Sequence, residues 1–211
     1  MLTNSNLWRR INYTILAPIY DRSVRFSARA RRRSAALLDP QPGERVLLVG
    51  AGTGIDLEFL PTGPEYVATD LVPAMVSRLR RRVERLALEQ VEVRVMDAMA
   101  LEFPDASFDA AVLHLILAVV PDAQRCMAEV ARVVKPGGRV VIFDKFAPPT
   151  GRRSVVLRLL NPLASLLGTN VNRPFEPLIA DGPWEIIAER HPHSGGLWRI
   201  VLLRRTGSRQ V

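Results

Sequence analysis

The stretch Val46-Leu47-Leu48-Val49-Gly50-Ala51-Gly52-Thr53-Gly54-Ile55-Asp56 decides the fold of this 211-residue chain. Four apolar residues precede three glycines spaced two apart, and apolar residues then recur at helical spacing. This order predicts a buried parallel strand, a tight turn and the start of a helix. Because glycine tolerates positive φ and carries no side chain, a ligand can lie directly on this turn. The turn is therefore a candidate cofactor site at the end of the first strand of an α/β sheet.

Strand and helix patterns alternate downstream of this turn. Strands are predicted at 45–49, 66–70, 91–97, 108–114 and 139–143, and helices at 56–60, from 73 to 86 and at 121–134. Such alternation is typical of a Rossmann-like, doubly wound parallel sheet, so the expected fold class is α/β. Two further strands, at 184–189 and 197–203, are joined by a loop short enough for a hairpin. The last strand should therefore run antiparallel.

Residues 1–40 differ in character from the rest of the chain. They contain an amphipathic helical pattern at 4–17 and a second, basic helix that ends near Leu38, before a Pro- and Gly-rich boundary at 39–43. Eight arginines and two aspartates give them +6 of the net charge of +8. We expect a helical cap at 1–40 that belongs to the same domain as a core at 41–211. Localised positive charge attracts anionic lipid or nucleic acid, and a solvated arginine-rich face is the alternative.

The composition excludes several protein classes. The 48% apolar fraction is ordinary for a globular chain, and no apolar run approaches the roughly 18 residues of a membrane span. Two arginines after Trp8 interrupt any signal-peptide core, so a cytoplasmic protein is expected. Cys126 is the only cysteine, which excludes an intrachain disulfide, and its helical context favours a buried core position. Three scattered histidines lack metal-ligand spacing, so no metal site is expected.

Details around the glycine turn discriminate between cofactors. A dinucleotide site favours G-x-G-x-x-G, whereas here the third glycine, Gly54, comes one residue early. Asp70, at the end of the second strand, could accept hydrogen bonds from ribose hydroxyls in either case. Asp97 ends the third strand, where its carboxylate could bind an adenine amino group. A reversed last strand is also unusual in a nicotinamide-binding fold.

Five motifs in order resemble those of the class I S-adenosylmethionine (SAM)-dependent methyltransferases. They are the glycine turn, Asp70, Asp97-Ala98, the Phe108-Asp109 strand and V-V-K-P-G-G-R-V-V-I at 133–142. Together they cover residues 44–145. The resemblance implies seven strands in the order 3-2-1-4-5-7-6, with the seventh strand antiparallel. It also implies SAM as the cofactor and S-adenosylhomocysteine (SAH) as its product.

The resemblance also suggests how the cofactor is held. Gly50 and Gly52 would pack under the methionine part of SAM, Asp70 would bind the ribose, and Leu71 and Asp97 would contact the adenine. A helix-cap or turn role is the alternative for the two aspartates. The full set of expected cofactor-binding residues is Gly50, Ala51, Gly52, Asp70, Leu71, Asp97, Ala98 and Leu113.

Two residues are candidates for a role in catalysis. His114 ends the fourth strand beside the expected pocket, where it could contact the substrate or remove a proton, or simply be satisfied by a backbone carbonyl. Tyr20-Asp21 resembles the Tyr-Asp of quinone-biosynthesis and phospholipid methyltransferases, in which the tyrosine closes over SAM; cap packing is the alternative. Asp144-Lys145 is expected to border the same pocket. The two residues could form an ion pair, or they could orient an anionic substrate. His191 and His193 are expected at the surface.

Methyl transfer from a sulfonium is an in-line displacement that depends on positioning. The basic N-terminus and a leucine-rich helix at 154–167 favour a lipid-associated acceptor, either a phospholipid headgroup amine or a lipophilic ring. An anionic membrane surface would then bind residues 1–40 and 151–168, at the inner membrane face. A soluble small-molecule N-, O- or C-methyltransferase and a non-catalytic SAM-binding protein are the alternatives. Nucleic acid is disfavoured, because His114-Leu115-Ile116-Leu117 replaces the Pro-Pro-aromatic element of amino-methylating DNA enzymes.

Overall fold

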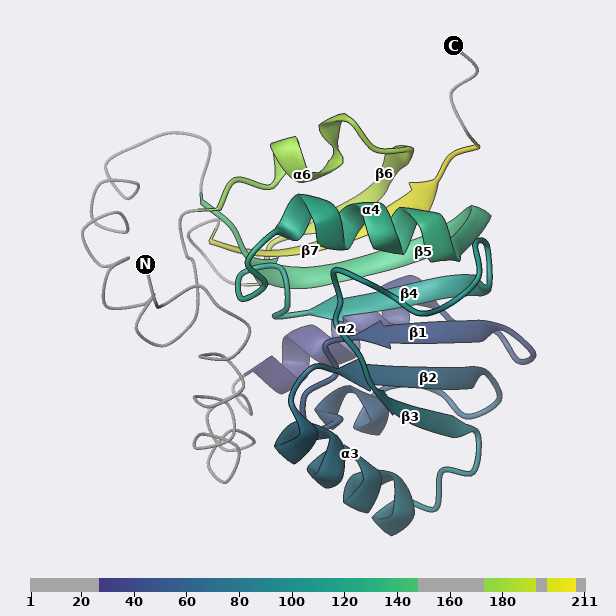
Figure 1. Cartoon of the computed structure of the whole chain (residues 1–211). Coiled ribbons are helices and arrows are strands. Elements are labelled where there is room, and N and C mark those ends of the chain that lie inside the picture. Colours follow the sequence, from purple (N-terminus) through teal and green to yellow (C-terminus); the bar gives the residue numbers. More distant parts are fainter. Residues whose placement is uncertain (1–26, 148–172, 193–196, 208–211) are drawn as a thin grey trace.

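The computed structural model describes residues 27–147, 173–192 and 197–207 (Figure 1). In these residues, seven strands form one sheet in the order β3-β2-β1-β4-β5-β7-β6. The strands are β1 (Arg45–Val49), β2 (Glu65–Asp70), β3 (Val91–Val95), β4 (Phe108–His114), β5 (Val134–Lys145), β6 (Trp184–Arg190) and β7 (Trp198–Arg205). Pairs from β3 to β5 are parallel, and β7 is antiparallel to both β5 and β6. The predicted fold class, strand order and antiparallel last strand are confirmed.

Helices cover the two faces of the sheet. Those in the described residues are α2 (Ala28–Leu38), the 3-10 helix η3 (Ile55–Glu58), α3 (Pro73–Arg85), α4 (Ala123–Val133) and α6 (Glu176–Ala180). Side chains alternate along β1, so Val46 and Leu48 enter the core beneath α2, η3 and α3, whereas Leu47 and Val49 pack toward α4 and α6. Figure 1 shows α2 behind the sheet and α4 in front of it. The sequence pattern of a strand buried on both faces is thereby explained.

Two elements differ from their predicted form. The helix expected at 56–60 is the four-residue η3, because Pro61 and Pro64 end it almost at once. The fifth strand begins at Val134 rather than Arg139. Its register against β4 shifts between Phe108 and Ala110, so the turn that precedes Arg139 forms a bulge inside β5. The other strands lie within two residues of their predicted bounds.

The described part of the N-terminal region is α2, which packs against β5 and β7. Its buried face consists of Ala30, Arg31, Ser34, Ala35 and Leu38. The helical pattern at 4–17, Tyr20 and the leucine-rich helix at 154–167 lie outside the described residues, so the cap at 1–40 stays a prediction. None of the described helices combines the length and the apolar character needed to cross a membrane.

Candidate functional site

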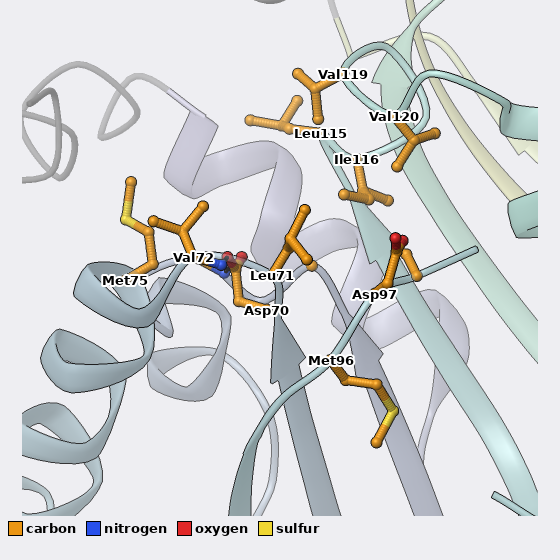
Figure 2. Close-up of a pocket in the computed structure, with 13 residues that line it drawn as sticks. Asp70, Leu71, Val72, Met75, Met96, Asp97, Leu115, Ile116, Val119 and Val120 are labelled. Atoms are coloured by element: carbon orange, nitrogen blue, oxygen red, sulfur yellow. Dashed lines mark hydrogen bonds between the residues drawn. The ribbon is translucent and has the colours of Figure 1, made fainter. Parts of the chain in front are cut away.

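A pocket opens at the carboxyl ends of the central strands, where the glycine turn leaves β1. It contains about 690 Å³ of empty space, part of which is open to solvent. Figure 2 shows Asp70, Leu71 and Val72 along one side and Leu115, Ile116, Val119 and Val120 facing them. We call residues 115–120 the apolar wall. The pocket is thus a slot between the end of β2 and the segment that follows β4.

Asp70 ties the glycine turn to the end of β2. The backbone N–H of Gly52 donates to Asp70 Oδ2 at 2.8 Å, and that of Val72 donates to Oδ1 at 2.9 Å. Burial raises the pKa of Asp70 to about 6, although the two backbone hydrogen bonds oppose this rise. Each carboxylate oxygen keeps a further lone pair for a ligand hydroxyl. Asp70 therefore has a structural role and remains able to bind a ligand.

The glycine turn and the apolar wall touch directly. Gly50 has a φ of +64°, and a Cβ placed on it would come within 2.4 Å of Ile116 Cδ1. Behind the turn, Arg82 Nη1 of α3 donates to the carbonyl oxygen of Thr53 at 2.8 Å. Only glycine satisfies both the conformation and the close approach at position 50.

Asp97 lies at the other end of the slot. Its Oδ1 accepts the backbone N–H of Met99 at 2.9 Å, as in an Asx turn, and the residue also lines the pocket. In Figure 2, Leu71 lies between Asp70 and Asp97. The slot therefore offers an elongated ligand a carboxylate near each end and an apolar surface in between.

The apolar wall is held by charged side chains. Leu115 has a φ of +60°, which is rare for a branched residue and marks a constrained backbone. The fully buried carboxylate of Asp144 accepts the backbone N–H of Ala118 at 3.0 Å, and burial raises its pKa. From the other side, the Arg173 guanidinium donates to the carbonyl oxygen of Val120 at 3.1 Å. These contacts fix the wall before any ligand arrives.

A second cluster consists of buried polar side chains, among them Arg31, Ser34, Asp56 and His114. His114 Nδ1 is 2.5 Å from Asp56 Oδ1, and His114 Nε2 is 2.8 Å from Ser34 Oγ. Arg31 Nη1 of α2 donates to the same Asp56 Oδ1 at 2.6 Å. Burial favours a high pKa for Asp56, but Arg31 and His114 outweigh it and hold the pKa below its usual range. The partners of His114 are therefore side chains rather than the backbone carbonyl considered above.

Six of the predicted cofactor residues line the pocket: Gly50, Gly52, Asp70, Leu71, Asp97 and Ala98. Ala51 does not, and its N–H instead donates to the carbonyl of Thr69 at 2.8 Å. Leu113 is fully buried in the core with α4 and does not line the pocket. His114 also lies outside the lining, and Tyr20 lies outside the described residues.

Other sequence expectations have clear outcomes. Cys126 is completely buried, as its helical context predicted. His191 is exposed, and His193 lies outside the described residues. Asp144 binds backbone N–H groups, whereas the ammonium of Lys145 lies 5.3 Å from the centre of the Trp198 ring.

Sequence reasoning missed most of the apolar lining. These residues are Val72, Met75, Met96, Leu115, Ile116, Val119 and Val120. The one available signal was the apolar run that continues past His114, beyond the predicted end of the fourth strand. It marked a buried segment but gave no indication of which side chains face a ligand.

The pocket suits the parts of SAM. The Gly50 turn leaves backbone rather than side chain at the cavity surface, Asp70 can accept from a ribose diol, and Asp97 can accept from an adenine amine. The apolar surface of Leu71 matches the flat face of a purine. The polarity of these groups and their order along the slot are therefore consistent with this cofactor.

Comparison with known proteins identifies the family. A family model described as a methyltransferase domain matches residues 47–142. The phosphatidylethanolamine N-methyltransferase of Cereibacter sphaeroides is 36% identical over 189 residues, which cover 89% of this chain and 93% of that protein. The demethylmenaquinone methyltransferase of Thermus thermophilus is 35% identical over 155 residues, 70% of each chain.

Solved structures agree on the fold. The geranyl diphosphate C-methyltransferase of Streptomyces coelicolor A3(2), solved with SAH, superposes with a TM-score of 0.69 at 16% identity and covers 84% of this chain and 76% of its own. The superposition shows the fold, and the family model and the two curated relatives assign the chain to one family. The protein belongs to the SAM-dependent methyltransferases, enzymes that take their methyl group from SAM.

Proposed function

We propose that this methyltransferase acts on a lipid-associated acceptor and that its substrate is the primary amine of a phospholipid headgroup. The observation that carries the proposal is the 36% identity to a phosphatidylethanolamine N-methyltransferase, which extends over 93% of that protein. A match of this length includes regions outside the cofactor motifs, and those regions determine the acceptor in a fold that serves many substrates.

In the proposed cofactor site, Gly50 and Gly52 present their backbone to the methionine part of SAM and Asp70 accepts from the ribose hydroxyls. Leu71 flanks the adenine, and Asp97 accepts from its amino group. SAM supplies a methyl group on a positively charged sulfur. Tyr20 is proposed to close over the site.

The apolar wall supports transfer to an amine. Only the neutral amine has the lone pair that attacks a methyl carbon, whereas an amine in water at neutral pH is mostly protonated. Surroundings such as Leu115, Ile116 and Val119 disfavour the ammonium form and so lower the pKa of a bound amine. The rest of the task is alignment of the two reactants and exclusion of water.

Basic residues support an approach to anionic lipid. Arg29, Arg32 and Arg33 are exposed on α2, within the region that holds +6 of the net charge. We propose that residues 1–40 and 151–168 bind the anionic surface of the inner membrane face peripherally, so that the lipid headgroup reaches the pocket without leaving the bilayer.

A second candidate acceptor is a lipophilic ring. The relative from T. thermophilus is named for demethylmenaquinone, and it is 35% identical over 70% of each chain. The same apolar wall would accommodate such a ring.

Mass spectrometry separates the candidates. The full-length enzyme is incubated with isotopically labelled SAM, with vesicles of phosphatidylethanolamine and phosphatidylglycerol and with free ethanolamine, in the presence or absence of a demethylmenaquinone. We expect label in mono- and dimethylated phosphatidylethanolamine and none in free ethanolamine. Label in the quinone alone would favour the second candidate, and label in free ethanolamine would refute a lipid acceptor.

Cosedimentation tests the membrane surface. Replacing Arg29, Arg32 and Arg33 by Gln should reduce binding to anionic vesicles at low salt by roughly 150-fold, because three charges at roughly 1 kcal/mol each contribute about 3 kcal/mol. The matched control replaces three exposed arginines of α3, Arg80, Arg81 and Arg85. Equal losses in the two variants would indicate a net-charge effect without a defined surface.

A further inference from the structure

The buried cluster of Arg31, Ser34, Asp56 and His114 has no part in the cofactor binding or the methyl transfer proposed above. Each of the four side chains is at most 7% exposed, and they come from α2, η3 and β4. Burying such groups is costly unless each finds a partner, and here each does. The cluster joins three segments that are otherwise far apart in the sequence.

Asp56 belongs to the cofactor side of the pocket. It is the second residue of η3 and follows the glycine turn by two residues, after Gly54 with a φ of +80°. The turn is itself fixed to β2 by the Gly52–Asp70 hydrogen bond. Any shift of Asp56 is therefore passed to the backbone on which the donor is proposed to lie.

His114 belongs to the acceptor side of the pocket. It is the last residue of β4, and the next residue is Leu115, the first of the apolar wall, in its left-handed conformation. A rotation at position 114 would therefore move the side chains of the wall. The Nδ1–Oδ1 contact of 2.5 Å joins the two sides directly.

The proton arrangement of this contact follows from its chemistry. Asp56 is held in its ionised form and can only accept, so Nδ1 of His114 carries the donated proton. In the neutral ring Nε2 then accepts from the Ser34 hydroxyl, 2.8 Å away. Because both ring nitrogens are engaged by side chains that do not line the pocket, His114 is oriented for support rather than for contact with the acceptor.

We propose that the Asp56–His114 pair is a positioning unit that sets the distance between the glycine turn and the apolar wall, and hence the alignment of methyl donor and acceptor. This inference rests on the proposed placement of donor and acceptor at those two segments. Ile116 Cδ1 lies 2.4 Å from where a Cβ of Gly50 would be, which is an independent contact between the same segments. In-line transfer is sensitive to such spacing, since a misplacement of about 1 Å can cost roughly 100-fold in rate.

The test compares two substitutions at one position. Asn in place of His114 keeps a donor near the Nδ1 position, whereas Phe keeps the ring volume and the edge contact with Phe143 but has no donor. We expect H114F to lower kcat for the methylation of phosphatidylethanolamine vesicles by labelled SAM on the order of 100-fold, while SAH affinity by calorimetry changes less than threefold. H114N should recover at least a tenth of the wild-type kcat.

Ser34→Ala distinguishes the Asp56–His114 contact from the rest of the cluster. It removes the Nε2 partner and leaves the Asp56–His114 contact, so kcat should fall less than fivefold. The proposal is overturned if S34A loses as much as H114F, if H114N behaves like H114F, or if SAH affinity falls in parallel with kcat.

Amide hydrogen exchange decides the inference without any acceptor. With SAH bound, the amides of residues 115–120 should exchange at least tenfold faster in H114F than in wild type or H114N, while those of α3 stay unchanged. If the wild-type enzyme methylates no lipid, the proposed acceptor is wrong and this measurement still tests the pair. Equal exchange at 115–120 in all three proteins would overturn it.

Discussion

Replacing Asp70 by Ala tests the proposed cofactor site most directly. The carboxylate accepts two backbone hydrogen bonds and has lone pairs left for two ribose hydroxyls. Hydrogen bonds to a charged acceptor contribute about 1.5 kcal/mol each at the low end, so losing both ribose contacts costs about 3 kcal/mol of binding free energy. That corresponds to a roughly 150-fold rise in the Kd for SAH at 25 °C.

The assay is titration calorimetry with SAH, with a thermal melt of each variant to exclude unfolding. Asp105→Ala is the matched control, because the Asp105 side chain is 77% exposed and lies outside the pocket lining. Asp70→Asn keeps one acceptor oxygen and should fall between Ala and wild type. A change in Kd below about fivefold in a folded Asp70→Ala variant would refute the ribose contact.

Three further predictions concern single groups. The pKa of Asp70 is about 6, and its ionised form binds hydroxyl groups best. The SAH affinity should therefore be constant from pH 7 to 8 and fall toward tenfold per pH unit below pH 6. An Asp70→Asn variant that kept this pH profile would contradict the prediction. Gly50→Ala and Gly43→Ala both place a side chain at positive φ, so each should lower the free energy of unfolding by roughly 1–2 kcal/mol in denaturant melts. Only the Gly50→Ala side chain also meets Ile116, so only this variant should weaken SAH binding, by 10-fold or more. Burial raises the pKa of Cys126 to about 12, so iodoacetamide at pH 8 should label it only after unfolding, as followed by mass spectrometry; rapid labelling of the native protein would contradict that burial.

Much of the fold could be predicted because its signals are local. Val46–Val49 is apolar at every position, as a strand covered on both faces must be, and the hairpin loop before β7 implied its reversed direction. The bulge in β5 could not be predicted in this way. A Pro-Gly-Gly run looks the same whether it ends a helix or lies within a strand, and only pairing with Phe108 and Ala110 distinguishes the two.

The site was predictable where backbone position alone brings a residue to the pocket. Asp70 ends β2, and Asp97 follows the end of the adjacent parallel strand β3 by two residues, so both had to lie at the same edge of the sheet. The orientation of His114 depends on Asp56, 58 residues away, and on Ser34, 80 residues away. Contacts over such separations depend on three-dimensional packing, which periodicity does not encode.

The position of β7 between β5 and β6 has a consequence for how the chain folds. Because β6 precedes β7 in the sequence and, among the strands that the structure describes, pairs with β7 alone, β6 has no place in the sheet until β7 is made. During synthesis β5 therefore remains an open edge, with unpaired backbone groups along a strand of buried apolar residues. Insertion of β7 closes that edge in one late, long-range step. The growing chain is most exposed to misassembly in the stage before this insertion.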